Sequence, residues 1–341
     1  MKRLIAVPAS IALVCGLAGS AFAAGEAVTG AGSTFIYPAL AKWAAAYKDK
    51  TGHKINYQAI GSGGGLRQLA KGTVDFAASD KPLTATELKE KGYMQFPAIV
   101  GGIVMSYNLP SVKKTLVLNG QTVADIYQGK IKYWDNAAVQ KLNPGVSLPH
   151  KYITTVHRAD GSGTTFNFTY YLSKVSKSWN KEVSYNTVVA WPGVGVGGKG
   201  NAGVANYIKQ IPGAIGYVEY AYAKETHMPA AKMVNASGHV VEADMETFKA
   251  AAKNAKWQAK NGFHLILANA PGEKSWPIAA STFVLVHKDE SAKKVDEVLK
   301  FFHWSYHHGQ KMAEKLDYVP IPKPVYQLIG QEWAFANYKV A

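Results

Sequence analysis

The chain reads Gly30-Ala31-Gly32-Ser33-Thr34-Phe35 just before a helical pattern begins. The same order, a short lead-in, a loop of Gly, Ser and Thr, and then a helical pattern, recurs at Gly61-Ser62-Gly63-Gly64-Gly65 and at Asp160-Gly161-Ser162-Gly163-Thr164-Thr165. Glycine lets the backbone approach a ligand closely, and the first N–H groups of a helix lack partners within the helix. The helix dipole favours negative charge at the same place. Each loop is therefore a candidate anion-binding loop.

A simpler interpretation competes with this one. Ser and Thr just before a helix are most often N-caps, and Ser33, Thr34, Ser62, Ser162 and Thr164 all have residue types that suit that role. For any single loop the cap is the plainer explanation. Three similar loops shift the balance toward anion binding only moderately.

Around these loops, short apolar runs alternate with amphipathic segments. The runs predict strands over residues 54–60, 73–78, 99–107, 154–157 and 282–287. Helical spacing of apolar residues begins at Ile36 and continues to Tyr47, and further helices are expected over residues 66–71, 166–174 and 202–210. This alternation predicts an α/β fold.

Two charged residues follow predicted strands. Arg158 comes directly after one strand, at the end where α/β proteins place ligands, and could offer paired donors to an oxyanion with Asp160 holding it. Asp80 follows another strand, and an ionised Asp can only accept hydrogen bonds. It would suit an anion that still carries a proton, such as phosphate, and would penalise sulfate. The local alternatives are a solvated Arg158–Asp160 pair and a turn or cap at Asp80.

Other motifs are weaker. Gly193, Gly195 and Gly198 fit a dinucleotide-binding pattern and residues 193–199 fit part of a P-loop, but Gly200 stands where a P-loop needs Ser or Thr, and Pro192 argues against a strand leading into the turn. We interpret residues 191–201 as a structural glycine-rich loop. The chain has no GxSxG or HExxH motif, so we expect no catalysis, no metal and no cofactor.

The N-terminus has the order of a secretory signal peptide: Lys2 and Arg3, an apolar run, and small residues up to Ala23. We expect cleavage after Ala23 and a periplasmic location. The only cysteine, Cys15, lies within this segment. The other 318 residues would carry 36 basic and 23 acidic side chains, the 38 Lys and Arg less Lys2 and Arg3, a net charge of +13. Because the lysines are spread out and not interleaved with aromatic residues, we do not expect nucleic-acid binding.

The sequence resembles the family of periplasmic phosphate-binding components of bacterial phosphate-specific ABC importers. Five separated blocks carry the resemblance: residues 29–35, 56–62, 74–80, 158–164 and 212–221. It implies a two-lobed periplasmic-binding-protein fold (type II-like), with the ligand in the interlobe cleft and two crossing hinge strands near residues 100–107 and 279–286. Lobe 1 would comprise residues 24–104 and 280–341, and lobe 2 residues 105–279.

The resemblance also implies roles for individual residues. Asp80 would accept the proton of the phosphate, and Asp160 would orient Arg158. Ser33 stands where members of the family often have Ala, and His157 where another Arg is common. The phosphate ligands carried over by motif are Ser33, Thr34, Phe35, Ser62, Asp80, Arg158, Ser162, Gly163 and Thr164.

The implied partners are inorganic phosphate and the membrane permease of an importer that also has a cytoplasmic ATPase, with the binding protein itself a monomer. Three other functions remain open at this point. One is binding of another tetrahedral oxyanion, such as arsenate or sulfate. The second is a secreted phosphatase with Ser62 or Ser162 as nucleophile. The third is an extracellular adhesin that uses the basic surface.

Overall fold

The computed structural model describes residues 27–288, 292–335 and 337–338. The expected signal peptide, residues 1–23, lies outside this range. Within it, no helix combines the length and the apolar character needed to cross a membrane.

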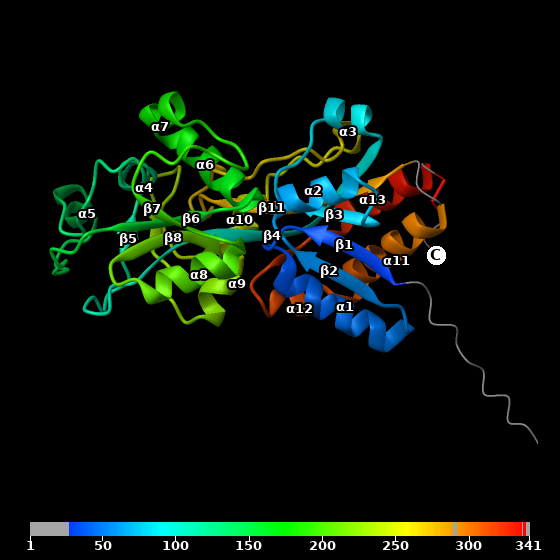
Figure 1. The fold of residues 1–341 in the computed structure, drawn as a ribbon, viewed down its shortest axis with the longest axis horizontal. Coiled ribbons are helices and arrows are strands. Elements are labelled where there is room, and N and C mark those ends of the chain that lie inside the picture. Colours follow the sequence, from blue (N-terminus) through cyan, green and yellow to red (C-terminus); the bar gives the residue numbers. More distant parts are fainter. Residues whose placement is uncertain (1–26, 289–291, 336, 339–341) are drawn as a thin grey trace, which may run out of the picture.

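A mixed nine-stranded sheet runs along the molecule in the order β2-β1-β3-β11-β4-β8-β6-β7, with β12 also paired to β4 (Figure 1). A second, three-stranded sheet has the order β10-β9-β5. The strands of the large sheet are β1 (Val28–Gly32), β2 (Ile55–Ala59), β3 (Phe76–Ser79), β4 (Tyr93–Tyr107), β6 (Thr154–Arg158), β7 (Gly195–Gly198), β8 (Ala214–Glu219), β11 (Ala279–His287) and β12 (Val319–Pro320). Those of the small sheet are β5 (Val117–Leu118), β9 (Lys232–Val234) and β10 (Val240–Val241).

Strand β4 joins two groups of strands. Its first part pairs with β11 up to Gly102, and its last residues, Ile103 to Tyr107, pair with β8. On one side, β1, β2 and β3 are parallel; on the other, β6, β7 and β8 are parallel. The two strands expected to cross between lobes lie within β4 and β11. The fold is therefore the predicted two-lobed α/β type.

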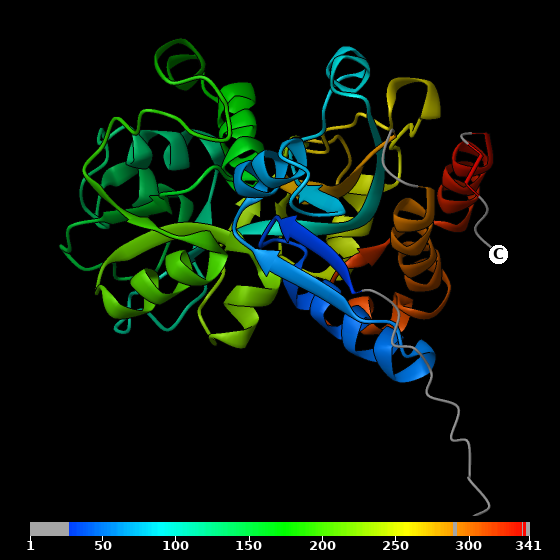
Figure 2. The same ribbon diagram turned by 45° about the vertical axis from the view of Figure 1, so that its right-hand side comes forward.

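Helices cover both faces of the sheet in each half of the molecule (Figures 1 and 2). Around β1–β3 they are α1 (Tyr37–Thr51), α2 (Ser62–Ala70), α3 (Ala85–Lys91), α11 (Ala292–His308), α12 (Gln310–Glu314) and α13 (Lys323–Phe335). The remaining helices are α4 (Gly120–Tyr127), α5 (Ala137–Leu142), α6 (Gly163–Val175), α7 (Lys177–Glu182), α8 (Gly200–Gln210), α9 (Tyr220–Glu225), α10 (Met245–Ala252) and the short 3-10 helix η1 (Ala259–Asn261).

Alternation along β3 explains the two layers. Ala77 packs with Leu69 of α2 in a small apolar cluster on one face, whereas Phe76 and Ala78 belong to the main core on the other. Phe76 there meets Phe302 of α11 edge to face, with ring centroids 5.4 Å apart. Successive side chains of a strand point to opposite faces, so a strand buried on both faces is apolar at consecutive positions, as β3 is at residues 76–78.

Two expectations about element boundaries were wrong. The loop expected at residues 61–65 is mostly the first turn of α2, which begins at Ser62. Glycines carry no side chain, so they hide helical periodicity. The glycine-rich segment at residues 191–201, interpreted as a structural loop, contains strand β7 paired to β6 and the start of α8. Pro192 precedes this strand without interrupting it.

Candidate anion-binding site

The predicted ligand residues meet at one place, although distant parts of the chain supply them. Residues 33–35 follow β1 and Asp80 follows β3, and these adjacent parallel strands end at the same edge of the sheet. Arg158 ends β6, and Gly163 begins α6. The two sets touch, since the Gly163 N–H donates to Ser62 Oγ over 3.1 Å. The eight predicted ligands other than Gly163 are each no more than 5% exposed, and Gly163 is also buried.

Most of the Ser and Thr residues are not caps. Helix α1 has Ile36 at its N-cap with no capping side chain, and α2 has Gly61 there, so Ser33, Thr34 and Ser62 have other roles. Ser162 does cap α6, because its Oγ accepts the Thr165 N–H at 3.0 Å. The simpler interpretation thus holds for one residue of the five and leaves the other hydroxyls to be explained.

Thr34 and Thr164 present donors from the two halves of the molecule. Thr34 Oγ1 accepts the backbone and side-chain N–H groups of Asn201, at 3.1 and 2.7 Å. Thr164 Oγ1 accepts from Arg158 Nη1 at 3.2 Å and from Asn201 Nδ2 at 3.3 Å. A hydroxyl has two acceptor lone pairs and one hydrogen. With both lone pairs engaged, each threonine has its hydrogen left to donate.

Their backbone N–H groups add to this donor set. Among the residues that the structure describes, neither the Thr34 nor the Thr164 N–H has a hydrogen-bond acceptor. Buried N–H groups without partners are rare and costly. Thr164 lies in the first turn of α6, where the helix dipole also favours a negative charge. The arrangement suits an anion that accepts several hydrogen bonds at once.

Three tyrosine hydroxyls hold the loop after β1 by its carbonyl oxygens. Tyr57 donates to the carbonyl of Ser33 at 2.8 Å, Tyr222 to that of Thr34 at 2.6 Å, and Tyr318 to that of Phe35 at 2.6 Å. The carbonyls of three successive loop residues therefore have hydrogen-bond partners outside the loop, and these bonds fix the orientation of the loop's peptide planes.

Arg158 is paired with Asp160. Its Nε donates to Oδ1 at 2.7 Å and its Nη2 to Oδ2 at 2.5 Å, while the Gly200 N–H also donates to Oδ1 at 3.0 Å. Burial opposes ionisation of Asp160, but the hydrogen bonds and charge of Arg158 outweigh it and lower the pKa of this carboxyl. The guanidinium is therefore held in one orientation by an ionised partner.

Asp80 is a buried carboxyl surrounded by hydroxyl donors. Its Oδ1 accepts from Ser33 Oγ at 2.6 Å and from Thr282 Oγ1 at 2.7 Å. Burial raises the pKa of Asp80 to about 6, against the lowering effect of these hydroxyls and of the Arg158 charge. At neutral pH the carboxylate is therefore ionised and able only to accept hydrogen bonds.

Two glycines are required where the halves meet. A Cβ at Gly163 would lie 2.5 Å from Ser62 Oγ and 2.6 Å from Asp80 Oδ2. A Cβ at Gly61, whose φ is +85°, would lie 2.0 Å from Asp160 Oδ2. These contacts show that the second oxygen of Asp80 faces the start of α6.

Sequence reasoning missed Asn201 and Thr282. Asn201 lies in the segment interpreted as a structural loop, but it is the second residue of α8 and its side chain reaches Thr34 and Thr164. Thr282 was assigned only to a strand, yet it binds Asp80 from β11. The glycine-rich run before α8 resembles the other three loops, and that similarity was the available signal for Asn201.

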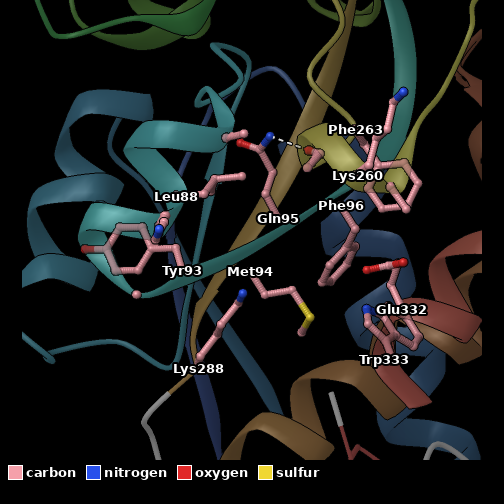
Figure 3. Close-up of a pocket in the computed structure, with 15 residues that line it drawn as sticks. Leu88, Tyr93, Met94, Gln95, Phe96, Lys260, Phe263, Lys288, Glu332 and Trp333 are labelled. Atoms are coloured by element: carbon pink, nitrogen blue, oxygen red, sulfur yellow. Dashed lines mark hydrogen bonds between the residues drawn. The ribbon is translucent and has the colours of Figure 1, made fainter. Parts of the chain in front are cut away.

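A cavity of about 360 Å³ lies elsewhere (Figure 3). It is bounded by α3, by the start of β4, by residues 259–263 and by α13. Its lining is mixed, with apolar side chains such as Phe96 and Trp333 beside the charged Lys260, Lys288 and Glu332. Gln95 faces it, but its amide already donates to the Gly262 carbonyl at 2.7 Å. None of the predicted anion ligands lines this cavity.

The fold and the site together define a two-lobed binding protein of the periplasmic type, built around an anion site at the carboxyl ends of strands. A family profile described as a PBP superfamily domain matches residues 18–306. The phosphate-binding protein PstS of Xylella fastidiosa is 49% identical over 309 residues, which is 90% of this chain and 85% of that protein. PstS of Haemophilus influenzae is 48% identical and covers 92% of this chain and 94% of its own length.

The chain therefore belongs to the PstS family of phosphate-binding proteins. Solved structures agree on the fold. A high-affinity periplasmic phosphate-binding protein bound with phosphate superposes with a TM-score of 0.75 at 18% identity, over 93% of this chain and 96% of that one. A putative phosphate ABC transporter substrate-binding protein from Clostridium perfringens has a TM-score of 0.64 at 19% identity, over 87% and 100%.

Proposed function

We propose that this protein binds inorganic phosphate with high affinity in the periplasm and delivers it to the permease of a phosphate ABC importer. Its PstS relatives are named as phosphate-binding proteins, and two structures of similar fold are described as containing phosphate. The observation that carries the proposal is the meeting of Asp80, an acceptor, with the donors of Thr34, Thr164 and Arg158 in one buried site.

The donors account for binding of an oxyanion. Thr34 would give its N–H and O–H from one lobe, and Thr164 would give the same pair from the other. The hydroxyls of Ser62 and Ser162 would complete the set, whereas the Gly163 N–H is engaged by Ser62 Oγ. Arg158, fixed by Asp160, would supply the positive charge. Ser33 and Phe35 are different, because their donors are already engaged within the protein. The Ser33 N–H donates to the Ala78 carbonyl and its hydroxyl to Asp80, and the Phe35 N–H donates to Ser33 Oγ.

Asp80 would select phosphate among oxyanions. Monohydrogen and dihydrogen phosphate carry a proton that a carboxylate can accept, whereas sulfate at neutral pH carries none. Two unprotonated oxygens facing each other in a dry site would cost on the order of several kcal/mol. Arsenate also carries a proton, so this residue would not reject it.

We also propose the lobe boundaries, with lobe 1 formed by residues 24–104 and 280–341 and lobe 2 by residues 105–279. The strands β4 and β11 would act as the hinge, and phosphate bound to one lobe would recruit the other. A monomer secreted through the signal peptide would then dock on the permease. The protein would act as a binder and not as a phosphatase, since Ser62 Oγ accepts two backbone N–H groups, from Asp80 and Gly163.

Titration calorimetry on residues 24–341, freed of phosphate, tests the proposal. We expect saturable binding at one site with a Kd between nanomolar and micromolar for phosphate, and far weaker binding of sulfate. Equal affinity for sulfate would refute the role of Asp80. Turnover of a phosphate ester that is lost on Ser62→Ala or Ser162→Ala would favour the phosphatase instead.

A further inference from the structure

Ser33 makes two hydrogen bonds that its position in the chain does not require. Its hydroxyl donates to Asp80 Oδ1 at 2.6 Å and accepts the Phe35 N–H at 2.9 Å. The side chain is buried, at 1% exposed, and it does not cap α1. The carbonyl of Ser33 is also held by Tyr57, so the loop does not depend on the Ser33 hydroxyl alone.

The contact with Asp80 fills one oxygen of the carboxylate. Oδ1 accepts from Ser33 and from Thr282, which uses the two in-plane lone pairs of that oxygen. The other oxygen, Oδ2, faces Gly163 at the start of α6, where an anion would lie. A proton on Oδ1 would have to displace one of the two hydroxyl donors. The ligand therefore meets Asp80 through Oδ2.

We propose that Ser33 is a positioning residue that sets oxyanion specificity: by donating to Oδ1, it keeps Asp80 ionised and makes Oδ2 accept a proton from the ligand. This inference rests on the proposed function and adds a residue that acts on phosphate through Asp80. Arg158 acts in the same direction by its charge, whereas Glu219, Tyr57 and Tyr318 are the other titratable groups near this carboxyl.

Removal of the hydroxyl has two separable effects. Ser33→Ala takes a donor from the ionised carboxylate, so a larger share of the protein carries a protonated Asp80 near pH 6. A protonated Asp80 can donate, and it no longer rejects sulfate. The change also frees the Phe35 N–H, but this donor would serve phosphate and sulfate alike. The ratio of the two affinities therefore reports on Asp80 alone.

The experiment measures phosphate and sulfate Kd values for residues 24–341 by calorimetry between pH 5.5 and 8. For Ser33→Ala we expect the sulfate-to-phosphate Kd ratio to lie about tenfold below that of the wild type, as the loss of one hydrogen bond to a charged group implies, and to rise with pH in both proteins as Asp80 ionises. Ser106→Ala is the matched control: Ser106 is equally buried, and its Oγ has no partner in the described structure. Its ratio should equal that of the wild type.

Thr282→Val removes the second donor to Oδ1 and should lower the ratio in the same pH range, which keeps the test decisive if Ser33→Ala does not fold. A wild-type ratio at every pH in both variants, or an equal fall in Ser106→Ala, would overturn the inference. Failure of the wild-type protein to bind phosphate would refute the proposed function, and the inference with it. If the wild type prefers phosphate and the Kd ratios of Ser33→Ala and Thr282→Val equal its own, the inference is refuted and the proposed function stands.

Discussion

Arg158 and Asp160 form a two-point ion pair, with Nε 2.7 Å from Oδ1 and Nη2 2.5 Å from Oδ2. Arg158 is the last residue of β6, and Asp160 follows two positions later. The remaining guanidinium nitrogen, Nη1, donates to Thr164 Oγ1 at 3.2 Å. Both residues are part of the network that the anion would enter. The site therefore uses both the charge and the planar shape of the Arg158 guanidinium.

Arg158→Lys should weaken phosphate binding roughly 30- to 100-fold, because an ammonium keeps the charge but cannot hold Asp160 and Thr164 at once. Calorimetric Kd values at pH 7.5 measure the effect. Arg67→Lys is the control, since Arg67 is exposed on α2. If both variants bind like the wild type, the guanidinium geometry is unimportant.

Asp80→Asn should reverse the preference between anions. The amide keeps the shape and still accepts from Ser33 and Thr282, but its NH₂ group can donate toward Oδ2's position. Phosphate should bind more weakly and sulfate relatively better. Competition between phosphate and sulfate, followed by calorimetry, measures the change. An unaltered preference would count against Asp80 as the selective group.

The same substitution should change how stability depends on pH. Because burial raises the pKa of Asp80 to about 6 in the folded protein, the folded state binds this proton more tightly than the unfolded state does. The free energy of unfolding therefore falls by about 3 kcal/mol as pH rises from about 4 to about 6, because the buried Asp80 must ionise in the folded protein over that range. Phosphate-free Asp80→Asn should be more stable than the wild type at pH 7, with the gain shrinking toward pH 4.5.

Urea unfolding curves of both proteins between pH 4.5 and 7.5 test this. A stability difference that stays constant over that range would show that Asp80 titrates outside it.

Tyr318→Phe should destabilise the protein by about 1 to 3 kcal/mol, because it leaves the buried Phe35 carbonyl without the hydroxyl that now lies 2.6 Å away. Thermal or urea unfolding measures the loss. Tyr207→Phe, at a 39% exposed position, serves as the control and should stay within about 0.5 kcal/mol. Equal effects in the two variants would contradict the role of the tyrosine hydroxyls in holding the loop.

Asn201→Ala should also cost about 1 to 3 kcal/mol, since Thr34 Oγ1, Thr164 Oγ1 and the Glu219 N–H each lose a partner. Phosphate affinity should fall too, because each threonine hydroxyl then keeps only one of its two donors and is oriented less firmly. Asn180→Ala, an exposed change on α7, should alter neither quantity. A stable Asn201→Ala with unchanged phosphate affinity would show that the threonines are oriented by other groups.

The sequence by itself determined the α/β class, because apolar runs and helical spacing are local patterns that depend only on the order of neighbouring residues. Loops of Gly, Ser and Thr indicated anion binding, and the resemblance of five blocks indicated the family. Local pattern failed where glycines carried no signal: the first turn of α2 was interpreted as a loop, and the start of α8 at Gly200 was missed.

Only the tertiary structure decided which polar groups meet. Sequence could not separate caps from ligands, because that choice depends on partners far along the chain: Ser62 lies 101 residues from Gly163, and Asp80 lies 202 residues from Thr282. Packing of β11 beside β3 brings the Thr282 hydroxyl to Asp80, and the start of α8 brings Asn201 to Thr34. Hydrogen bonds act over about 3 Å, so the chemistry of the loops was readable in sequence while their pairing was set by the fold.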